Sequence, residues 1–275
     1  MKLTITQPTP LLEALITLCP DSSKTRLREF VRQGRISVDE DVVTRSDITL
    51  NPGQTLYFDE HKVKYDRSGL KIVFEDPYLV VIDKPSGLLS VASNFEEKIT
   101  AHAKIKKRYY PKKVFVVHRL DQDTSGLMLF TTHHESYLAL KEALKQRTIK
   151  RTYHAIVEGK LEGTGTWKSY LQEDSNYFVH ASDDPEEGEL AITHYEAVES
   201  KNGQTLVRFT LESGKKNQIR VQSARAGHPI VGDSKYGAKS NRYKRLALHA
   251  TNLDLIHPET QKPLAFSSPF PLAIT

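Results

Sequence analysis

One short polar segment carries more kinds of reactive side chain than any other part of this 275-residue chain. Residues 118–126 read His-Arg-Leu-Asp-Gln-Asp-Thr-Ser-Gly, which puts a histidine, an arginine, two carboxylates and two hydroxyls close together. Apolar residues precede this segment at 114–117 and follow it at 127–130. A polar segment between two strand-like runs is typical of a surface loop on a rigid sheet, where functional groups tend to lie.

Two kinds of metal site are open to these residue types. Asp121 and Asp123 form an Asp-x-Asp pair, and magnesium prefers carboxylate oxygens together with water or phosphate. His118, His133 and His134 could bind zinc, but no cysteine lies nearby and their spacing is unfavourable. Asp-x-Asp pairs are common by chance, so we expect a protein that needs no metal.

Two other interpretations of the loop involve no metal. Ser125 could be a nucleophile, although Thr124-Ser125-Gly126 lacks the Gly-x-Ser-x-Gly turn that exposes a catalytic serine. The loop could also be purely structural, with Arg119 paired to an aspartate and the last three residues forming a turn. The loop alone does not decide between these alternatives.

Basic residues flank the loop on both sides. The group before it contains Lys104, Lys106, Lys107, Arg108, Lys112 and Lys113 around Tyr109 and Tyr110, and the group after it contains Lys141, Lys145, Arg147, Lys150 and Arg151. Basic groups neutralise phosphates, and aromatic faces stack on bases. With a net charge of +5, this pattern indicates RNA as the partner, with Lys106, Lys107 and Arg108 as candidate contacts. The alternative is two solvated helix faces.

Several protein classes are disfavoured by composition. No long apolar run could span a membrane, and the N-terminus lacks the apolar stretch of a signal peptide. Cys19 is the only cysteine, so no intramolecular disulfide can form. No strand-to-helix Gly-x-Gly-x-x-Gly occurs, so a nucleotide cofactor is unsupported. We expect a cytoplasmic monomer without a cofactor.

Residues 1–62 form a predicted small α/β unit. Ser22, Ser23 or Thr25 can cap a helix whose apolar residues Leu27, Phe30 and Val31 share one face. Its other side carries the basic residues Lys24, Arg26, Arg28, Arg32 and Arg35. Short strands follow, at 35–38 and 55–58. Together these features resemble the S-four-like RNA-binding domain, which makes the five basic residues candidate RNA contacts.

Residues 61–69 read as a polar linker, and residues 70–275 as a larger catalytic domain. Strands are predicted at 70–75, 78–82, 152–157, 190–198, 204–211 and 246–255, and helices at 134–146 and 217–226. These elements do not alternate strictly. The pattern therefore favours an α+β fold with a mixed or antiparallel sheet.

The segment 118–126 matches the His-Arg-Leu-Asp-x-x-Thr-Ser-Gly signature of the RluA-type pseudouridine synthases. Further segments resemble the family's other motifs in the same order: 75–88 with Asp-Lys-Pro-Ser-Gly-Leu, 150–159 with the tyrosine-bearing strand, 214–237, and Leu248-His249-Ala250 before His257-Pro258. The resemblance covers about 70 to 265. It implies an isomerase that converts uridine to pseudouridine in structured RNA, with ribosomal RNA favoured and transfer RNA possible.

The resemblance also implies roles for individual residues. Asp121 would be the nucleophile and Arg220 its cationic partner. Tyr153 would stack under the uracil of a flipped-out nucleotide and relay a proton. Leu248 would pack on the other side of the base, and Arg119 would reach RNA phosphate or the cavity that holds the flipped base. Other substrate contacts are expected from His118, Lys215 and Gln218.

The last motif departs from the family pattern. Members commonly read Gly-Arg-Thr-His-Gln-Ile-Arg-x-His, whereas Lys215, Asn217 and Gln222 replace the first arginine and both histidines here. This departure is the basis of an alternative function, a non-catalytic RNA-binding protein derived from a synthase. A magnesium-dependent phosphodiesterase built on Asp121 and Asp123 is a third possibility.

Overall fold

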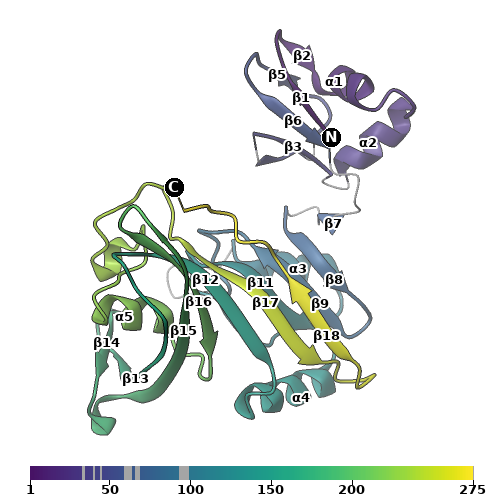
Figure 1. Ribbon diagram of the computed structural model, residues 1–275. Helices are drawn as coiled ribbons and strands as arrows, with labels where there is room; N and C mark the ends of the chain where they lie inside the picture. Colours follow the sequence, from purple (N-terminus) through teal and green to yellow (C-terminus); the bar gives the residue numbers. More distant parts are fainter. Residues whose placement is uncertain are drawn as a thin grey trace.

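The structure, a computed structural model, describes residues 1–32, 35–39, 41–43, 45–58, 64–65, 69–92 and 99–274 (Figure 1). The N-terminal part contains β1 (Lys2–Thr4), β2 (Thr9–Pro10), α1 (Leu11–Leu18), α2 (Lys24–Arg32), β3 (Ile36–Val38), β4 (Asp41–Val42), β5 (Thr49–Leu50) and β6 (Thr55–Phe58). Its main sheet has the strand order β1-β6-β3-β4, and β2 pairs with β5.

Helix α2 forms as the sequence predicts. Leu27, Phe30 and Val31 are buried in a core formed by residues 5–58. Ser23 Oγ accepts a 3.3 Å hydrogen bond from the Arg26 N–H and so caps the helix.

The basic residues of this part differ in their surroundings. Lys24, Arg26 and Arg28 are exposed, whereas the Arg35 guanidinium packs 4.2 Å from the ring centroid of Phe30. The Arg32 side chain lies outside the described part of the chain. A separate S-four-like RNA-binding domain over 1–62 stays a prediction.

One large sheet of twelve strands makes up most of the remaining chain (Figure 1). Its strands are β7 (Lys64–Tyr65), β8 (Lys71–Glu75), β9 (Leu79–Lys84), β10 (Phe115–Val116), β11 (Ser125–Thr131), β12 (Lys150–Glu158), β13 (Thr164–Glu173), β14 (Val179–Ser182), β15 (Glu189–Lys201), β16 (Gln204–Leu211), β17 (Leu248–Ile256) and β18 (Pro263–Ser267). The helices are α3 (Ala101–Tyr109), α4 (His134–Lys145) and α5 (Gln218–Arg225).

The strand order is β14-β13-β15-β16-β12-β17-β11-β9-β8-β7, with β10 on β11 and β18 on β17. The pairs are antiparallel except for β11 with β17, which run parallel. This mixed sheet confirms the predicted α+β class. Part of the expected linker, Lys64–Tyr65, pairs with Lys71 and Ile72 of β8, and residues 61–63 and 66–68 lie outside the described residues.

Strand β11 is buried on both faces, which explains its uninterrupted apolar sequence. Met128 and Phe130 belong to the core that includes Ile105 of α3. Leu127 and Leu129 belong to a second core that includes Leu140 of α4. The rigid centre of the sheet therefore carries the polar loop at the N-terminal end of β11.

Strands β13, β14 and β18 and helix α3 were not among the predicted elements. The burial pattern of β13 leaves most of its residues exposed or half-buried, so its sequence has no apolar run that would signal a strand. None of the described helices combines the length and apolar character that a membrane span requires.

Candidate active site

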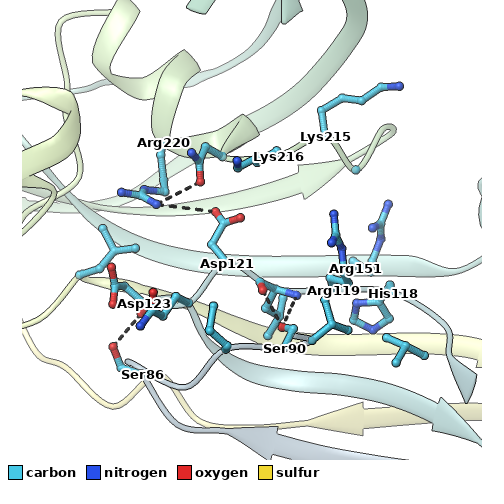
Figure 2. A pocket seen from close by; sticks show the side chains of 18 of the residues that line it. Ser86, Ser90, His118, Arg119, Asp121, Asp123, Arg151, Lys215, Lys216 and Arg220 are labelled. Atoms are coloured by element: carbon cyan, nitrogen blue, oxygen red, sulfur yellow. Dashed lines mark hydrogen bonds and ion pairs between the residues drawn. The ribbon is translucent and has the colours of Figure 1, made fainter. Parts of the chain in front are cut away.

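The polar loop opens onto a groove of about 1790 Å³. Side chains from the loop, from α4, from the segment before α5 and from residues 232–246 line it (Figure 2). The Asp121 carboxylate points across the groove toward Arg220 (Figure 2). Strand β11 and helix α5 therefore position two of the predicted catalytic residues opposite each other.

A small cavity of about 60 Å³ adjoins this groove. Its lining includes the three predicted catalytic residues and four of the predicted substrate contacts: Asp121, Tyr153, Arg220, Arg119, Leu248, Lys215 and Gln218. These residues come from distant parts of the sequence. The structure thus brings together every predicted catalytic or substrate-binding residue except His118.

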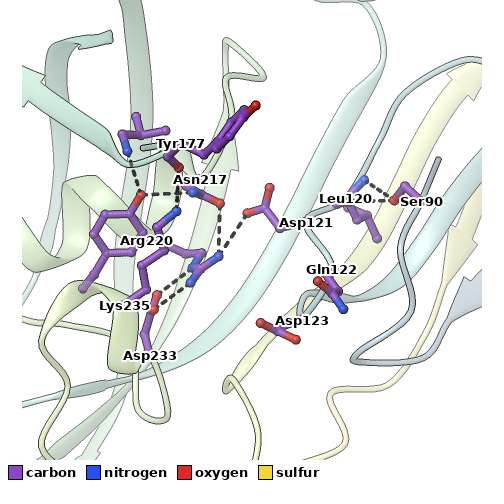
Figure 3. A network of polar contacts seen from close by, with 12 residues as sticks. Ser90, Leu120, Asp121, Gln122, Asp123, Tyr177, Asn217, Arg220, Asp233 and Lys235 are labelled. Carbon is purple, nitrogen blue, oxygen red and sulfur yellow. Dashed lines mark hydrogen bonds and ion pairs between the residues drawn. The ribbon is translucent and has the colours of Figure 1, made fainter. Parts of the chain in front are cut away.

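Arg220 has two carboxylate neighbours (Figure 3). Its Nε and Nη2 each donate a 2.7 Å hydrogen bond to Asp233, which is 1% exposed. Its Nη1 lies 4.0 Å from Asp121 Oδ2 and donates a 3.1 Å hydrogen bond to Asn217 Oδ1. The two bonds to Asp233 fix the plane of the guanidinium, so that Nη1 faces Asp121.

Opposing effects act on Asp121. Burial raises the pKa of its carboxyl above the ordinary range of an aspartate, because the charged form loses water. The Arg220 guanidinium, the Asn217 backbone N–H and Lys84 oppose this shift of the Asp121 pKa. Burial is the largest of these effects, so the pKa of Asp121 is raised overall. The side chain stays 25% exposed to the groove, where an incoming substrate can reach it.

Asn217 and Tyr236 hold the arginine from the other side. The Asn217 Nδ2 donates a 3.0 Å hydrogen bond to Tyr236 Oη, and the Arg220 guanidinium lies 5.2 Å from the Tyr236 ring centroid. Sequence reasoning assigned no role to Asp233, Asn217 or Tyr236. The signal was present, since all three lie within the segment 214–237 that resembles the family's last motif.

Tyr153 and Leu248 lie on neighbouring strands. β12 pairs with β17, with Tyr153 opposite Ala250 and Ala155 opposite Leu248. Tyr153 is 5% exposed and Leu248 is 3% exposed, and both line the small cavity. Burial raises the pKa of the Tyr153 hydroxyl, so the phenol stays protonated at neutral pH.

Two of the predicted substrate contacts are already occupied. The Gln218 amide accepts from Ser213 Oγ and from the Lys215 N–H, and donates to Ile192 O and to Thr193 Oγ1. Lys215 Nζ donates a 2.6 Å hydrogen bond to Glu189. Arg119, by contrast, is exposed in the groove.

His118 has a structural contact. Its Nε2 accepts a 3.2 Å hydrogen bond from the Leu129 N–H, and its side chain is buried. Burial lowers the pKa of His118 to about 3, so the ring is neutral. The ring therefore braces β11, while the residue also borders the groove.

Two buried polar side chains, Lys84 and Ser90, hydrogen-bond to the backbone of the loop and of the turn beside it. Lys84 is 0% exposed, and its Nζ donates to the carbonyl oxygens of Pro85, Leu88 and Gln122. Ser90 Oγ donates a 2.6 Å hydrogen bond to Leu120 O. The loop conformation around Asp121 is thus fixed by backbone contacts that sequence reasoning missed.

Ser125 does not have the surroundings of a nucleophile. Its Oγ is buried, bonded to His249 Nδ1 at 2.7 Å, and accepts a 2.5 Å hydrogen bond from Arg245. His249 Nε2 continues the network to Ser268 Oγ at 3.0 Å. These bonds tie the end of the loop to the C-terminal segment.

The metal alternatives find little support in the described part of the chain. No three His, Cys, Asp or Glu side chains gather there in a way that could hold a metal ion. The Asp123 carboxylate lies apart from that of Asp121 (Figure 3).

The two basic groups are placed differently. Lys141, Lys145 and Arg151 of the second group line the groove. Lys106, Lys107 and Arg108 of the first lie on α3 and are absent from its lining, and Arg108 forms an ion pair with Glu75. Lysines from segments around α5, such as Lys216 and Lys235, also line the groove.

Comparison with known proteins identifies the family. The model of the RNA pseudouridylate synthase family matches residues 78–225. An uncharacterized RNA pseudouridine synthase of Bacillus subtilis is 34% identical, over 91% of this chain and 86% of its own length. The ribosomal large subunit pseudouridine synthase D of Nitrosomonas europaea is also 34% identical, over 94% of this chain and 80% of its own.

A solved structure agrees on the fold. Human RNA pseudouridylate synthase domain containing 4 superposes with a TM-score of 0.60 at 22% identity, covering 73% of this chain and 88% of that one. The family match includes the loop of Asp121 and the strand of Tyr153. The chain belongs to the RNA pseudouridine synthases of the RluA type, isomerases that act on uridines in RNA.

Proposed function

We propose that this protein converts specific uridines of ribosomal RNA to pseudouridine, with Asp121 as the nucleophile. Relatives at 31–34% identity are named ribosomal large subunit pseudouridine synthase D, which favours ribosomal over transfer RNA. The observation that carries the proposal is the common cavity of Asp121, Tyr153 and Leu248, with Arg220 4.0 Å from the Asp121 carboxylate.

The target nucleotide leaves the RNA stack and enters the groove, because its base is inaccessible within a helix. Cations along the groove hold the flanking phosphates without reading sequence. The uracil then lies between the Tyr153 ring and the Leu248 side chain. Arg119, exposed at the groove, contacts phosphate or takes the place of the flipped base.

The reaction exchanges one bond to the sugar for another. The bond between the sugar C1′ and uracil N1 breaks, and a bond between C1′ and uracil C5 forms. The proton on C5 is lost and N1 gains one, so the product is an isomer of the substrate. Asp121 acts as the nucleophile, since carboxylates attack anomeric carbons in retaining glycosidases. Because the Tyr153 hydroxyl is protonated, it relays the C5 proton by passing its own proton to the Asp121 carboxylate, which is freed when C5 bonds to C1′, while its oxygen accepts the proton from C5. The proton then reaches N1, so no proton is gained or lost overall.

The altered last motif is compatible with catalysis. The Gln222 amide bonds to Thr193 Oγ1, Ser169 Oγ and Ala191 O, so it joins α5 to the sheet. Asn217 bonds to Arg220 and to Tyr236. Asn217 therefore holds Arg220 directly, and Gln222 fixes the helix that carries it, which argues against a degenerate, non-catalytic protein.

The test is to map pseudouridines in ribosomal and transfer RNA from cells that contain or lack the protein, and to complement with variants. We expect ribosomal sites to be lost without it and not restored by Asp121→Asn. Asp123→Asn is the matched control in the same loop and should restore them. Isomerisation by purified Asp121→Asn would contradict the nucleophile assignment, and RNA cleavage that a chelator abolishes would favour the phosphodiesterase alternative.

A further inference from the structure

The turn between β13 and β14 carries an exposed aromatic residue to the edge of the groove. Tyr177 is 51% exposed and lines the groove that also contains Asp121 and Arg220. In Figure 3, Tyr177 lies above Asn217, and Lys235 and Arg220 lie on the same side of Asp121 as Tyr177. Aromatic rings beside a positively charged groove can stack on the bases of a single-stranded nucleic acid.

Tyr177 has an unfavourable backbone conformation. Its φ is 62°, in the left-handed region that is rare for bulky residues and less costly for asparagine or glycine. Asp174 maintains the turn, because its Oδ1 accepts from the Asn176 and Phe178 N–H groups and its carbonyl accepts from the Tyr177 N–H. A strained residue kept by its surroundings is a frequent mark of a functional position.

The turn is coupled to the catalytic centre by packing. The Phe178 ring lies 4.8 Å from the ring of Tyr236, and the Val179 N–H donates to Tyr236 Oη. Tyr236 in turn contacts Arg220. The residues that directly follow Tyr177 are therefore packed against the group that holds Arg220.

Two lysines accompany the tyrosine. Lys216 Nζ lies 5.4 Å from the Tyr177 ring centroid and forms an ion pair with Glu173. Lys235 Nζ donates a 2.8 Å hydrogen bond to the Tyr177 carbonyl oxygen. Both lysines line the groove. An aromatic ring with adjacent ammonium groups matches a nucleotide, in which a flat base lies next to a phosphate.

We propose that Tyr177 stacks on an unpaired base of the RNA close to the uridine that enters the Asp121 cavity, with Lys216 and Lys235 near the adjoining phosphates. This inference rests on the proposed function, because it assumes an RNA in the groove. Stacking on a ring is tolerant of base identity, so the subsite selects for an unstacked nucleotide and not for a sequence. This subsite would favour target uridines in RNA loops or at the ends of RNA helices.

The test compares two fluorescently labelled probes of equal length, a single-stranded oligouridylate and an oligomer with the same phosphates but no bases. Tyr177→Asn removes the ring but suits the left-handed backbone, and Tyr177→Phe keeps the ring. We expect the Asn variant to bind the oligouridylate at least about five-fold more weakly, as loss of one stacked base implies. Its affinity for the abasic probe should be unchanged, and the Phe variant should bind both probes like the parent.

Thermal unfolding supplies an independent readout. The Asn variant should have an equal or higher Tm, since the strained tyrosine is replaced, and this would exclude misfolding as the cause of weaker binding. The proposal is overturned if the Asn variant binds both probes normally, or if it loses affinity for both equally. Failure of the parent protein to bind the oligouridylate would overturn this subsite, whereas the proposed function is tested separately by the mapping of pseudouridines in ribosomal RNA.

Discussion

Arg220 gives two of its hydrogen bonds, both 2.7 Å long, to Asp233, and approaches Asp121 only to 4.0 Å. Asp233 is therefore the partner that determines where the guanidinium lies. Asp121 is left without a direct hydrogen bond from the arginine, so its carboxylate can turn toward a substrate. This difference between Asp233, which holds the arginine, and Asp121, which is free to react, underlies the first three predictions.

Replacing Arg220 should affect stability and activity unequally. Arg220→Ala leaves Asp233 buried without a cation and should cost about 3–5 kcal/mol, as for a broken buried ion pair. Arg220→Lys keeps a charge but not the paired geometry, so it should be more stable than the alanine variant and still slow. Denaturant unfolding and single-turnover assays measure both effects. Full turnover by both variants would show that Arg220 does not support Asp121.

The same change should alter the pH profile. Burial already raises the pKa of Asp121, so activity should fall in acid at a higher pH than an ordinary aspartate would give. Arg220 favours the charged carboxylate, so Arg220→Lys with its poorer geometry should move the acid limb of kcat/KM further upward. If the acid limb of kcat/KM lay at the same pH in Arg220→Lys and the parent, Arg220 would have no effect on the pKa of Asp121.

Asp233→Asn should destabilise the protein because it leaves a buried guanidinium without its counter-charge. The double variant Arg220→Met with Asp233→Leu should recover stability, since apolar residues often replace a buried pair without loss. It should not recover activity, because Asp121 then has no arginine. The experiment is a double-mutant cycle made of the parent, Arg220→Met, Asp233→Leu and the double variant. The free energy of unfolding and the turnover rate are measured for each protein. Recovery of turnover in the double variant would refute a role for this pair in catalysis.

Tyr153→Phe should fold and bind RNA almost normally, because the ring remains in the cavity. Loss of the hydroxyl should slow release of product from the intermediate by about 10²-fold or more, the size of a general acid–base contribution. Rapid-quench measurements at saturating RNA separate this step from binding. Equal rates for phenylalanine and tyrosine would leave Tyr153 with stacking alone.

Lys84 makes stability depend on pH. Burial lowers its pKa to about 7 in the folded protein, against 10.5 for the unperturbed group. Between these values the unfolded chain binds more protons, so this lysine makes the free energy of unfolding rise with pH from about 7 to about 10. In Lys84→Met the free energy of unfolding should rise less between about pH 7 and about pH 10 than in the parent, whether the variant is more or less stable overall. Parallel pH curves for the two proteins would mean that Lys84 stays charged on its three carbonyl partners.

Removal of residues 1–63 should leave a folded catalytic part. The buried apolar residues of 5–58 form a core of their own, and the cores around the active site use residues from 70 onward. RNA binding should weaken and its salt dependence should flatten, because Lys24, Arg26 and Arg28 no longer displace counterions. Titration at several salt concentrations measures both. An unchanged salt slope would show that this part does not bind the RNA used, and an insoluble product would show that it packs into the main core.

The residue types and their order in the sequence were enough to predict the family, the α+β class and the members of the cavity. Apolar runs buried on both faces, such as residues 127–130 of β11, are visible in a sequence because every position is apolar. Asp121, Tyr153 and Arg220 were predicted as catalytic residues through motifs, and the structure places all three at one cavity.

Other features depend on contacts between distant segments, and only the tertiary structure decided them. Asp233 could be recognised as the partner of Arg220 only once α5 and the segment after it were folded together. Whether a lysine reaches the groove depends on the direction of its helix, which is why Lys141 lines it and Lys106 does not. Hydrogen-bond partners such as those of Gln222 and His118 lie across strands whose register no local pattern specifies.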